Sequence, residues 1–262
     1  MIARCGLAFL SMVCWPIVCI GAAAQSPLAS DQNGTVYYNE DGIKAPKLAP
    51  TDFSPVVVSN DCEYDRAGIV RLSLVVNSQG RSEKVAPLFP FNDDIDKAAM
   101  SIAEVDLFSP GAKNGVPVAV AQELEVKLTV CRVKFVDKDG TTSVRLRLKS
   151  APVQKLLPAA KELPPSPGHI GQANSSPPVP LVTPEAEYPP EQRLRGIQGS
   201  CLISLVVDAK GQPQAMRVVR GTNEQFDEKA LDAVAKYLFK PARKGNDSIP
   251  VMMSIVVNFR LH

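Results

Sequence analysis

The stretch "SLVVDAKG", Ser204 to Gly211, has a near-twin in "SLVVNSQG", Ser73 to Gly80. In each stretch apolar residues recur at every second position, which is typical of a strand with one buried face. Each stretch ends in a glycine, which readily adopts the positive φ that a tight return requires. The pair therefore predicts the same strand and turn twice, 131 residues apart.

The likeness extends well beyond the two turns. An alignment without gaps places Gly68 to Pro110 on Gly199 to Pro241, and twelve of the 43 positions are identical. The identities fall on a strand, a turn, a helix start and a helix end, so the sequence predicts one fold used twice. The identical residues of the first copy are Gly68, Ser73, Leu74, Val75, Val76, Gly80, Asn92, Asp96, Ala99, Leu107, Phe108 and Pro110.

The middle of each copy changes from the period of a strand to that of a helix. Phe226, Ala230 and Val234 recur at every fourth position, and a proline stops each helical pattern. Two strands precede each helix and one follows it. We therefore expect an α+β fold of two small β-β-α-β domains, each a three-stranded antiparallel sheet with one packed helix. The first domain adds a C-terminal hairpin at Lys138 to Gly140.

Prolines mark the domain organisation. Eleven of the 23 lie between Pro152 and Pro190, where Ser and Gly also cluster, and this composition is typical of a semi-rigid linker. The expected organisation is a signal peptide at 1–24, a flexible lead-in at 25–50, a first domain at 51–149, a Pro-rich linker at 150–183 and a second domain at 184–262.

The N-terminus has the pattern of an export signal. Arg4 precedes an apolar run from Cys5 to Gly21, and Ala22 to Ala24 form an A-x-A cleavage site. Cleavage would release the protein into the periplasm. The alternative is an uncleaved single-pass anchor in the inner membrane, because an apolar run of about 20 residues is long enough to span a bilayer.

Composition and motifs narrow the functional classes. A net charge of +2 without a clustered basic element argues against a nucleic-acid partner. The sequence has no HExxH, GxSxG, Gly-rich phosphate loop or Cys-x-x-Cys motif, and its two histidines, His169 and His262, are far apart. We expect no enzymatic activity, no cofactor and no metal site.

Three cysteines follow the expected cleavage site. Cys62 precedes the first strand of copy one and Cys131 ends its third strand, so their ends meet if the strands are antiparallel neighbours. A disulfide between Cys62 and Cys131 is one expected outcome, and two free thiols are the other. Cys201 lies on an apolar face and is expected to be a buried free thiol.

The second copy resembles the TonB C-terminal domain family over nearly all of residues 184–262. The first copy resembles a degenerate member, with Val57-Val58 where the family has Tyr-Pro. The residues that carry the resemblance are Tyr188-Pro189, Gly199, Val207-Asp208, Gly211, Val218-Val219, Phe226-Asp227, Ala230-Leu231, Phe239, Pro241-Ala242, Gly245, Pro250-Val251 and Phe259.

The resemblance implies a periplasmic module that binds an extended peptide, the TonB box of an outer-membrane transporter, by strand addition to a sheet edge. The last strand, Val251 to Leu261, is the expected edge, with Glu185 to Tyr188 as a second surface. Alternatively, Tyr188 and Pro189 only fix the entry of the chain, and the protein is a structural or self-associating envelope protein that uses the same edges. The candidate peptide-binding residues are Glu185, Tyr188, Pro189, Met252, Ser254, Val256, Asn258 and Arg260.

Overall fold

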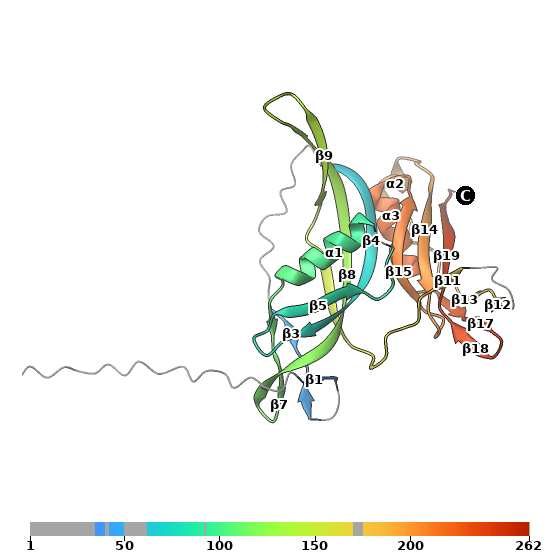
Figure 1. The fold of residues 1–262 in the computed structure, drawn as a ribbon. Helices are drawn as coiled ribbons and strands as arrows, with labels where there is room; N and C mark the ends of the chain where they lie inside the picture. Colours follow the sequence, from blue (N-terminus) through green and yellow to red (C-terminus); the bar gives the residue numbers. More distant parts are fainter. Residues whose placement is uncertain (1–34, 40–41, 50–61, 92, 170–174, 262) are drawn as a thin grey trace, which may run out of the picture.

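A computed structural model describes residues 35–39, 42–49, 62–91, 93–169 and 175–261 (Figure 1). The expected signal peptide and the Val57-Val58 pair lie outside these residues. The protein is an α+β fold, with mostly strands and few helices. None of the helices in the described part of the chain is long and apolar enough to cross a membrane.

Two stretches, which we call the first unit (62–149) and the second unit (184–261), contain the long elements. The first unit contains β4 (Glu63–Val76), β5 (Ser82–Pro87), α1 (Asp94–Val105), β6 (Phe108–Ser109), β7 (Gly111–Lys113), β8 (Val116–Val136) and β9 (Thr142–Leu148). The second contains α2 (Pro190–Leu194), β14 (Gly199–Val207), β15 (Pro213–Arg220), α3 (Glu224–Val234), β16 (Leu238–Lys240), β17 (Ala242–Lys244), β18 (Asp247–Ile249) and β19 (Val251–Phe259).

The lead-in and the linker also contribute strands, where the sequence suggested flexible or polyproline chain. In the lead-in, β1 pairs with β8, β2 with β7 and β3 with β6. In the linker, β10 pairs with β8 and β11 with β19, while β12 and β13 pair with β17 and β16. The bounds are β1 (Val36–Tyr37), β2 (Ile43–Lys44), β3 (Lys47–Leu48), β10 (Val153–Pro158), β11 (Gly168–His169), β12 (Ser175–Ser176) and β13 (Val179–Val182).

The two units share one sheet, in the order β11-β19-β14-β15-β4-β8-β7-β2. Strand β4 makes the joint because the edge that faces away from β8 has two partners: its C-terminal half pairs with β5, and Gly68 in its other half pairs with Arg217 of β15. A Cβ atom on Gly68 would lie 3.0 Å from the carbonyl oxygen of Met216. The absence of a side chain at Gly68 therefore permits the close approach of the two strands.

Strand β4 is buried on both faces, since the helices lie on opposite sides of the sheet (Figure 1). Ala67 and Ile69 point toward α3 and pack with Phe226 of the second unit. Residues at even positions, from Val70 to Val76, pack with α1 instead. The units therefore share part of their apolar core in addition to one sheet.

The turns that follow β4 and β14 are built in the same way. Gly80 and Gly211 have φ of 79° and 82°, and each donates its N–H to the carbonyl three residues earlier. Asn77 and Asp208 each accept two backbone N–H groups of their turn through one side-chain oxygen. The carbonyl of each glycine then accepts the N–H of a phenylalanine that follows the helix.

A buried ion pair crosses the joint. Arg217 of β15 is 3% exposed and pairs with Asp96 of α1, whose side chain is 4% exposed. The Arg217 guanidinium also lies 3.3 Å from a carboxylate oxygen of Asp93 and donates to the carbonyl of Ile69 at 3.1 Å. Its carbon lies 4.9 Å from the centre of the Phe91 ring. The charge of the first unit's buried carboxylate is therefore balanced by the second unit.

A second buried carboxylate, in the second unit, accepts a hydrogen bond from the first unit. Asp227 of α3 accepts the hydroxyl of Tyr64, from β4, at 2.6 Å and the thiol of Cys201 at 2.8 Å. Burial raises the pKa of Asp227 and, as the largest cause, raises the pKa of the Cys201 thiol as well. Each unit therefore supplies a hydrogen-bond donor to the buried aspartate of the other.

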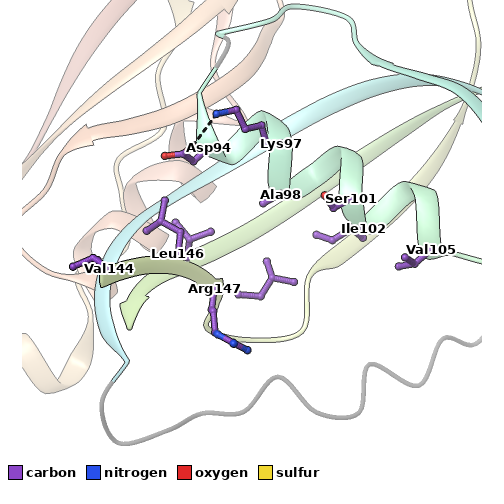
Figure 2. A pocket seen from close by; sticks show the side chains of 11 residues that line it. Asp94, Lys97, Ala98, Ser101, Ile102, Val105, Val144, Leu146 and Arg147 are labelled. Atoms are coloured by element: carbon purple, nitrogen blue, oxygen red, sulfur yellow. Dashed lines mark hydrogen bonds and ion pairs between the residues drawn. The ribbon is translucent and has the colours of Figure 1, made fainter. Parts of the chain in front are cut away.

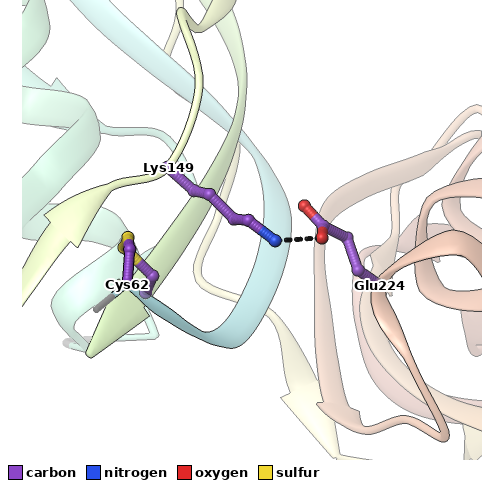
Figure 3. Close-up of a disulfide and its surroundings, with 4 residues drawn as sticks. Cys62, Lys149 and Glu224 are labelled. Atoms are coloured by element: carbon purple, nitrogen blue, oxygen red, sulfur yellow. Dashed lines mark hydrogen bonds and ion pairs between the residues drawn. A yellow bond between two sulfur atoms is a disulfide. The ribbon is translucent and has the colours of Figure 1, made fainter. Parts of the chain in front are cut away.

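A part-buried ion pair and a disulfide lie near the joint. Lys149, beyond β9, reaches Glu224 at the start of α3, as Figure 3 shows next to the disulfide. Cys62 and Cys131 form that disulfide, with their Cα atoms 5.4 Å apart. Cys131 lies inside β8 rather than at its end, because β8 continues into the hairpin with β9. The disulfide therefore ties the start of β4 to the base of this hairpin.

Candidate functional site

Strand β19 forms an outer edge of the shared sheet. On one side it pairs with β14 in an unbroken antiparallel register, from Gly199 opposite Phe259 to Val207 opposite Val251. On its other side the only described neighbour is β11, which pairs in parallel with Val251 and Met252. Beyond Met252, no strand in the described part of the chain pairs with this side of β19.

The direction of the backbone groups of β19 follows from one hydrogen bond. The N–H of Gly168 in β11 donates to the carbonyl of Pro250 at 2.9 Å, so the carbonyl of Pro250 points outward. In an antiparallel ladder, backbone groups of successive residues point alternately toward the partner and away from it. The register with β14 is regular, so Ser254, Val256 and Asn258 also present their N–H and C=O groups outward.

The outer edge of β8, the last long strand of the first unit, is by contrast filled. Strand β10 covers Gln122 to Lys127 and strand β9 covers Val130 to Val136. Strands β7 and β1 cover the start of β8. In the described residues, β19 therefore has an open edge where β8, the strand in the equivalent position of the first unit, is covered.

A cavity of about 540 Å³ lies at the C-terminal end of β19. Strand β19 and Arg260 form one wall, and the chain that enters the second unit forms the other. The cavity is lined by Thr183, Pro184, Glu185, Ala186, Tyr188, Arg193, Tyr237, Val256, Val257, Asn258, Phe259 and Arg260.

Tyr188 belongs partly to the core and partly to this cavity. Its ring meets Phe226 and Phe259 edge-on, with centroid distances of 5.6 Å and 5.8 Å. Its hydroxyl donates to the carbonyl of Ile197 at 2.5 Å. Pro189 is buried at the start of α2. These contacts favour the interpretation that Tyr188 and Pro189 fix the entry of the chain, and they leave only part of the Tyr188 ring facing the cavity.

The cavity brings together five of the eight candidate residues: Glu185, Tyr188, Val256, Asn258 and Arg260. The other three lie elsewhere. Pro189 is buried, Met252 is opposite His169, and Ser254 is exposed on β19 without lining the cavity.

Arg193 and Tyr237 line the cavity and were not expected there. The Arg193 guanidinium lies 5.2 Å from the centre of the Tyr188 ring, and burial raises the pKa of Tyr237. The sequence signal for Arg193 was Pro190 followed by Glu191, which is typical of the first turn of a helix. For Tyr237 no local signal distinguishes a cavity residue from a core residue.

The charges around this cavity are mixed. The lining contains the acidic Glu185 and the basic residues Arg193 and Arg260. Just outside, Lys229 of α3 donates to Glu187 at 2.5 Å, and this hydrogen bond lowers the pKa of the exposed Glu187 carboxyl. The site thus combines charged side chains with the outward backbone groups of β19. The described residues contain no group of three or more His, Cys, Asp or Glu that could hold a metal ion.

A second hollow, an apolar groove of about 600 Å³, lies between α1 and β9 (Figure 2). Its floor includes Ile102, Val105 and Leu146, and the Asp94–Lys97 ion pair is at its rim. Strand β9 pairs with β8 along one of its edges, and no strand in the described residues pairs with the other. None of the eight candidate residues lines this groove.

Comparison with known proteins places the relationship in the second unit. Residues 184–261 match the family described as Gram-negative bacterial TonB protein C-terminal. Protein tonB2 of Pseudomonas aeruginosa is 31% identical over 83 residues, which are 31% of this chain and 31% of that protein. The chain thus matches about a third of the length of this curated relative.

A solved structure was also found, the solution NMR structure of the Pseudomonas aeruginosa TonB CTD. It is 21% identical, covers 36% of this chain and 94% of that chain, and has a TM-score of 0.30. The sequence match shows that residues 184–261 of this chain are similar to the TonB C-terminal domain family.

Proposed function

We propose that this is an exported, periplasmic TonB-like protein that binds an extended peptide segment by strand addition to β19 and takes part in outer-membrane transport. The peptide is of the TonB-box type and belongs to an outer-membrane transporter. The observation that carries the proposal is the open edge of β19, beside a cavity that contains five of the expected residues. The similarity of residues 184–261 to the TonB C-terminal family supports it.

The geometry of the edge defines what a bound strand would contact. Its backbone would pair with the outward groups of Ser254, Val256 and Asn258, and its end would enter the cavity near Arg260. Main-chain hydrogen bonds would supply affinity, and alternate side chains would set the register. Glu185 and Arg193 would recognise polar or charged groups at the end of the peptide that enters the cavity.

We further propose that the two units are copies of one domain, and that only the second retains this binding role. The equivalent turns support this, because their side-chain and backbone hydrogen bonds correspond one to one. At the spacing of the repeat, Gln122 to Lys127 of β8 correspond to Met253 to Asn258 of β19. Strand β10 already occupies that edge in the first unit.

A pair of substitutions at Val256 tests the proposal. Val256→Pro removes an outward N–H and leaves the hydrogen bonds to β14 intact, which an edge strand tolerates. Val256→Ala shortens the exposed side chain but retains the N–H. We expect Val256→Pro to weaken binding of labelled TonB-box peptides about tenfold, since it removes a hydrogen bond and adds a ring in the path of the strand. Val256→Ala should change it less than about threefold.

The measurement is fluorescence anisotropy on the mature protein, with circular dichroism to show that both variants are folded. Equal affinities for the two variants would exclude pairing at this edge. Binding by neither variant nor the wild type, at peptide concentrations near 1 mM, would exclude the function itself; that concentration corresponds to about −4 kcal/mol.

Self-association at the same edge is the second candidate function. The outward groups of Ser254 and Asn258 lie symmetrically about Val256, which is 56% exposed, so two β19 strands could pair antiparallel. A structural or self-associating envelope protein would then have a concentration-dependent mass in light scattering that Val256→Pro abolishes and peptide does not change.

A further inference from the structure

The linker places a strand on the outer edge of each unit. Strand β10 covers six consecutive residues of β8, whereas β11 covers only Val251 and Met252 of β19. After His169 the described chain resumes at Ser175, where β12 pairs with β17 rather than with β19. The pairing of β11 with β19 is therefore short, and the linker strands on either side of it, β10 and β12, pair with other strands.

The contact uses the same backbone groups that strand addition would use. Gly168 donates to the carbonyl of Pro250 at 2.9 Å, and the parallel register places the N–H of Met252 opposite the carbonyl of Gly168. Pro250 and Met252 belong to the same outward series as Ser254, Val256 and Asn258. A strand bound along this series cannot extend past Ser254 while β11 is in place.

We propose that β11 is an internal competitor for the β19 edge. It confines an incoming strand to the part of the edge from Ser254 to Arg260, and its release lengthens the available edge by the groups of Pro250 and Met252. The proposal rests on the strand-addition function proposed above. It adds that the linker, by holding or releasing two residues, regulates both the length and the affinity of the bound segment.

Strand β11 is a weak competitor because only a few backbone groups take part in its pairing with β19. A two-residue contact contributes little, because each net hydrogen bond adds only about 0.5–1.5 kcal/mol. A competitor of this strength keeps the edge covered without blocking a longer partner. It also reduces the unpaired edge that would otherwise invite pairing between copies of the chain.

Two substitutions at Gly168 separate the contact from other effects. Gly168→Pro removes the N–H that donates to Pro250, whereas Gly168→Ala retains it. In the mature protein without peptide, we expect Gly168→Pro to speed hydrogen exchange of the Met252 amide at least about fivefold, the loss of roughly one net hydrogen bond. The amide of Met253, which faces β14, should not change. Gly168→Ala should behave as the wild type at both positions.

Peptide binding then tests competition itself. We expect Gly168→Pro to tighten binding of TonB-box peptides about two- to tenfold, the range of one such hydrogen bond. Unchanged exchange at Met252 would overturn the proposal. Faster exchange with unchanged peptide affinity would overturn it too, because the contact would exist without competing.

If neither the wild type nor Gly168→Pro binds peptide, the proposed function fails. Light scattering then decides whether β11 prevents the β19 edge from pairing with a second copy of the chain. Self-association of Gly168→Pro alone would then support the competitor role, and an unchanged mass would overturn it.

Discussion

Replacing Arg217 by methionine should strongly destabilise the protein, because its guanidinium balances the buried carboxylate of Asp96. The substitution keeps much of the side-chain volume and removes the cation. Asp96 would then remain buried without its cation, with the N–H of Phe91, at 2.7 Å, still donating to its carboxylate. A buried pair broken on one side costs about 3–5 kcal/mol.

Two further variants make this reasoning testable. Arg220→Met changes an exposed arginine on the same strand and should alter stability by less than about 0.5 kcal/mol. The double variant Arg217→Met with Asp96→Asn removes both charges and should recover part of the loss, because a neutral pair lacks an unpaired buried charge. Urea unfolding of the mature chain, followed by circular dichroism, gives all four free energies of unfolding.

A cost for Arg217→Met within about 1 kcal/mol of that for Arg220→Met would contradict this expectation. A double variant as unstable as the single one would show instead that the packing of Arg217 against Phe91 and the carbonyl of Ile69 matters more than its charge.

Two other predictions concern Asp227 and the turn glycines. Burial raises the pKa of Asp227 in the folded protein. The protonated carboxyl therefore stabilises the fold at low pH, and this contribution is lost as the pH rises above about 3.9, the pKa of Asp in the unfolded chain. The free energy of unfolding of the wild type minus that of Asp227→Asn should therefore fall between pH 4 and pH 7, as urea titrations at the two pH values will show; a constant or rising difference contradicts it. Gly211→Ala should cost about 3 kcal/mol or more, since its φ is 82° and the added Cβ would lie 1.8 Å from the carbonyl oxygen of Phe239. Gly140→Ala, with the same φ of 82° and no atom within 4 Å, should cost only about 1–2 kcal/mol in the same assay, and equal costs would contradict the steric argument.

Local patterns in the sequence predict much of the α+β architecture. The period-two runs locate the faces of β4 and β14, because a one-residue shift would place their apolar residues in water. Gly80 and Gly211 locate the turns, since both need a positive φ. The helical period locates α1 and α3, whose buried faces include Ile95 and Phe226.

The joint between the units could not be derived in the same way. Asp96 and Arg217 are 121 positions apart, and no periodic pattern relates residues at such a distance. One signal was present: Ala67, Ile69 and Val70 make β4 apolar on both sides, which is typical of a strand buried on both faces. The strands of the linker depend on the docked units, because two-residue pairings such as β11 have no stability of their own.

Part of the candidate site follows from the sequence because every second side chain of β19 faces away from the apolar core. Val256, Asn258 and Arg260 were expected for this reason, and they line the cavity. Arg193 comes from α2 and Tyr237 from the turn between α3 and β16, so their position depends on how the chain packs around Tyr188.

The shared strand β4 also constrains the order in which the chain folds. The first unit is synthesised before Arg217, so the carboxylate of Asp96 must stay hydrated until β15 is in place. Contacts between residues that far apart form slowly. During that interval, Ala67 and Ile69 and one half of the β4 edge face water, which is a typical starting point for misassembly. The disulfide between Cys62 and Cys131 would hold this half of β4 against β8 in the meantime. Oxidation of the first unit before the second is complete would thus favour correct assembly of both.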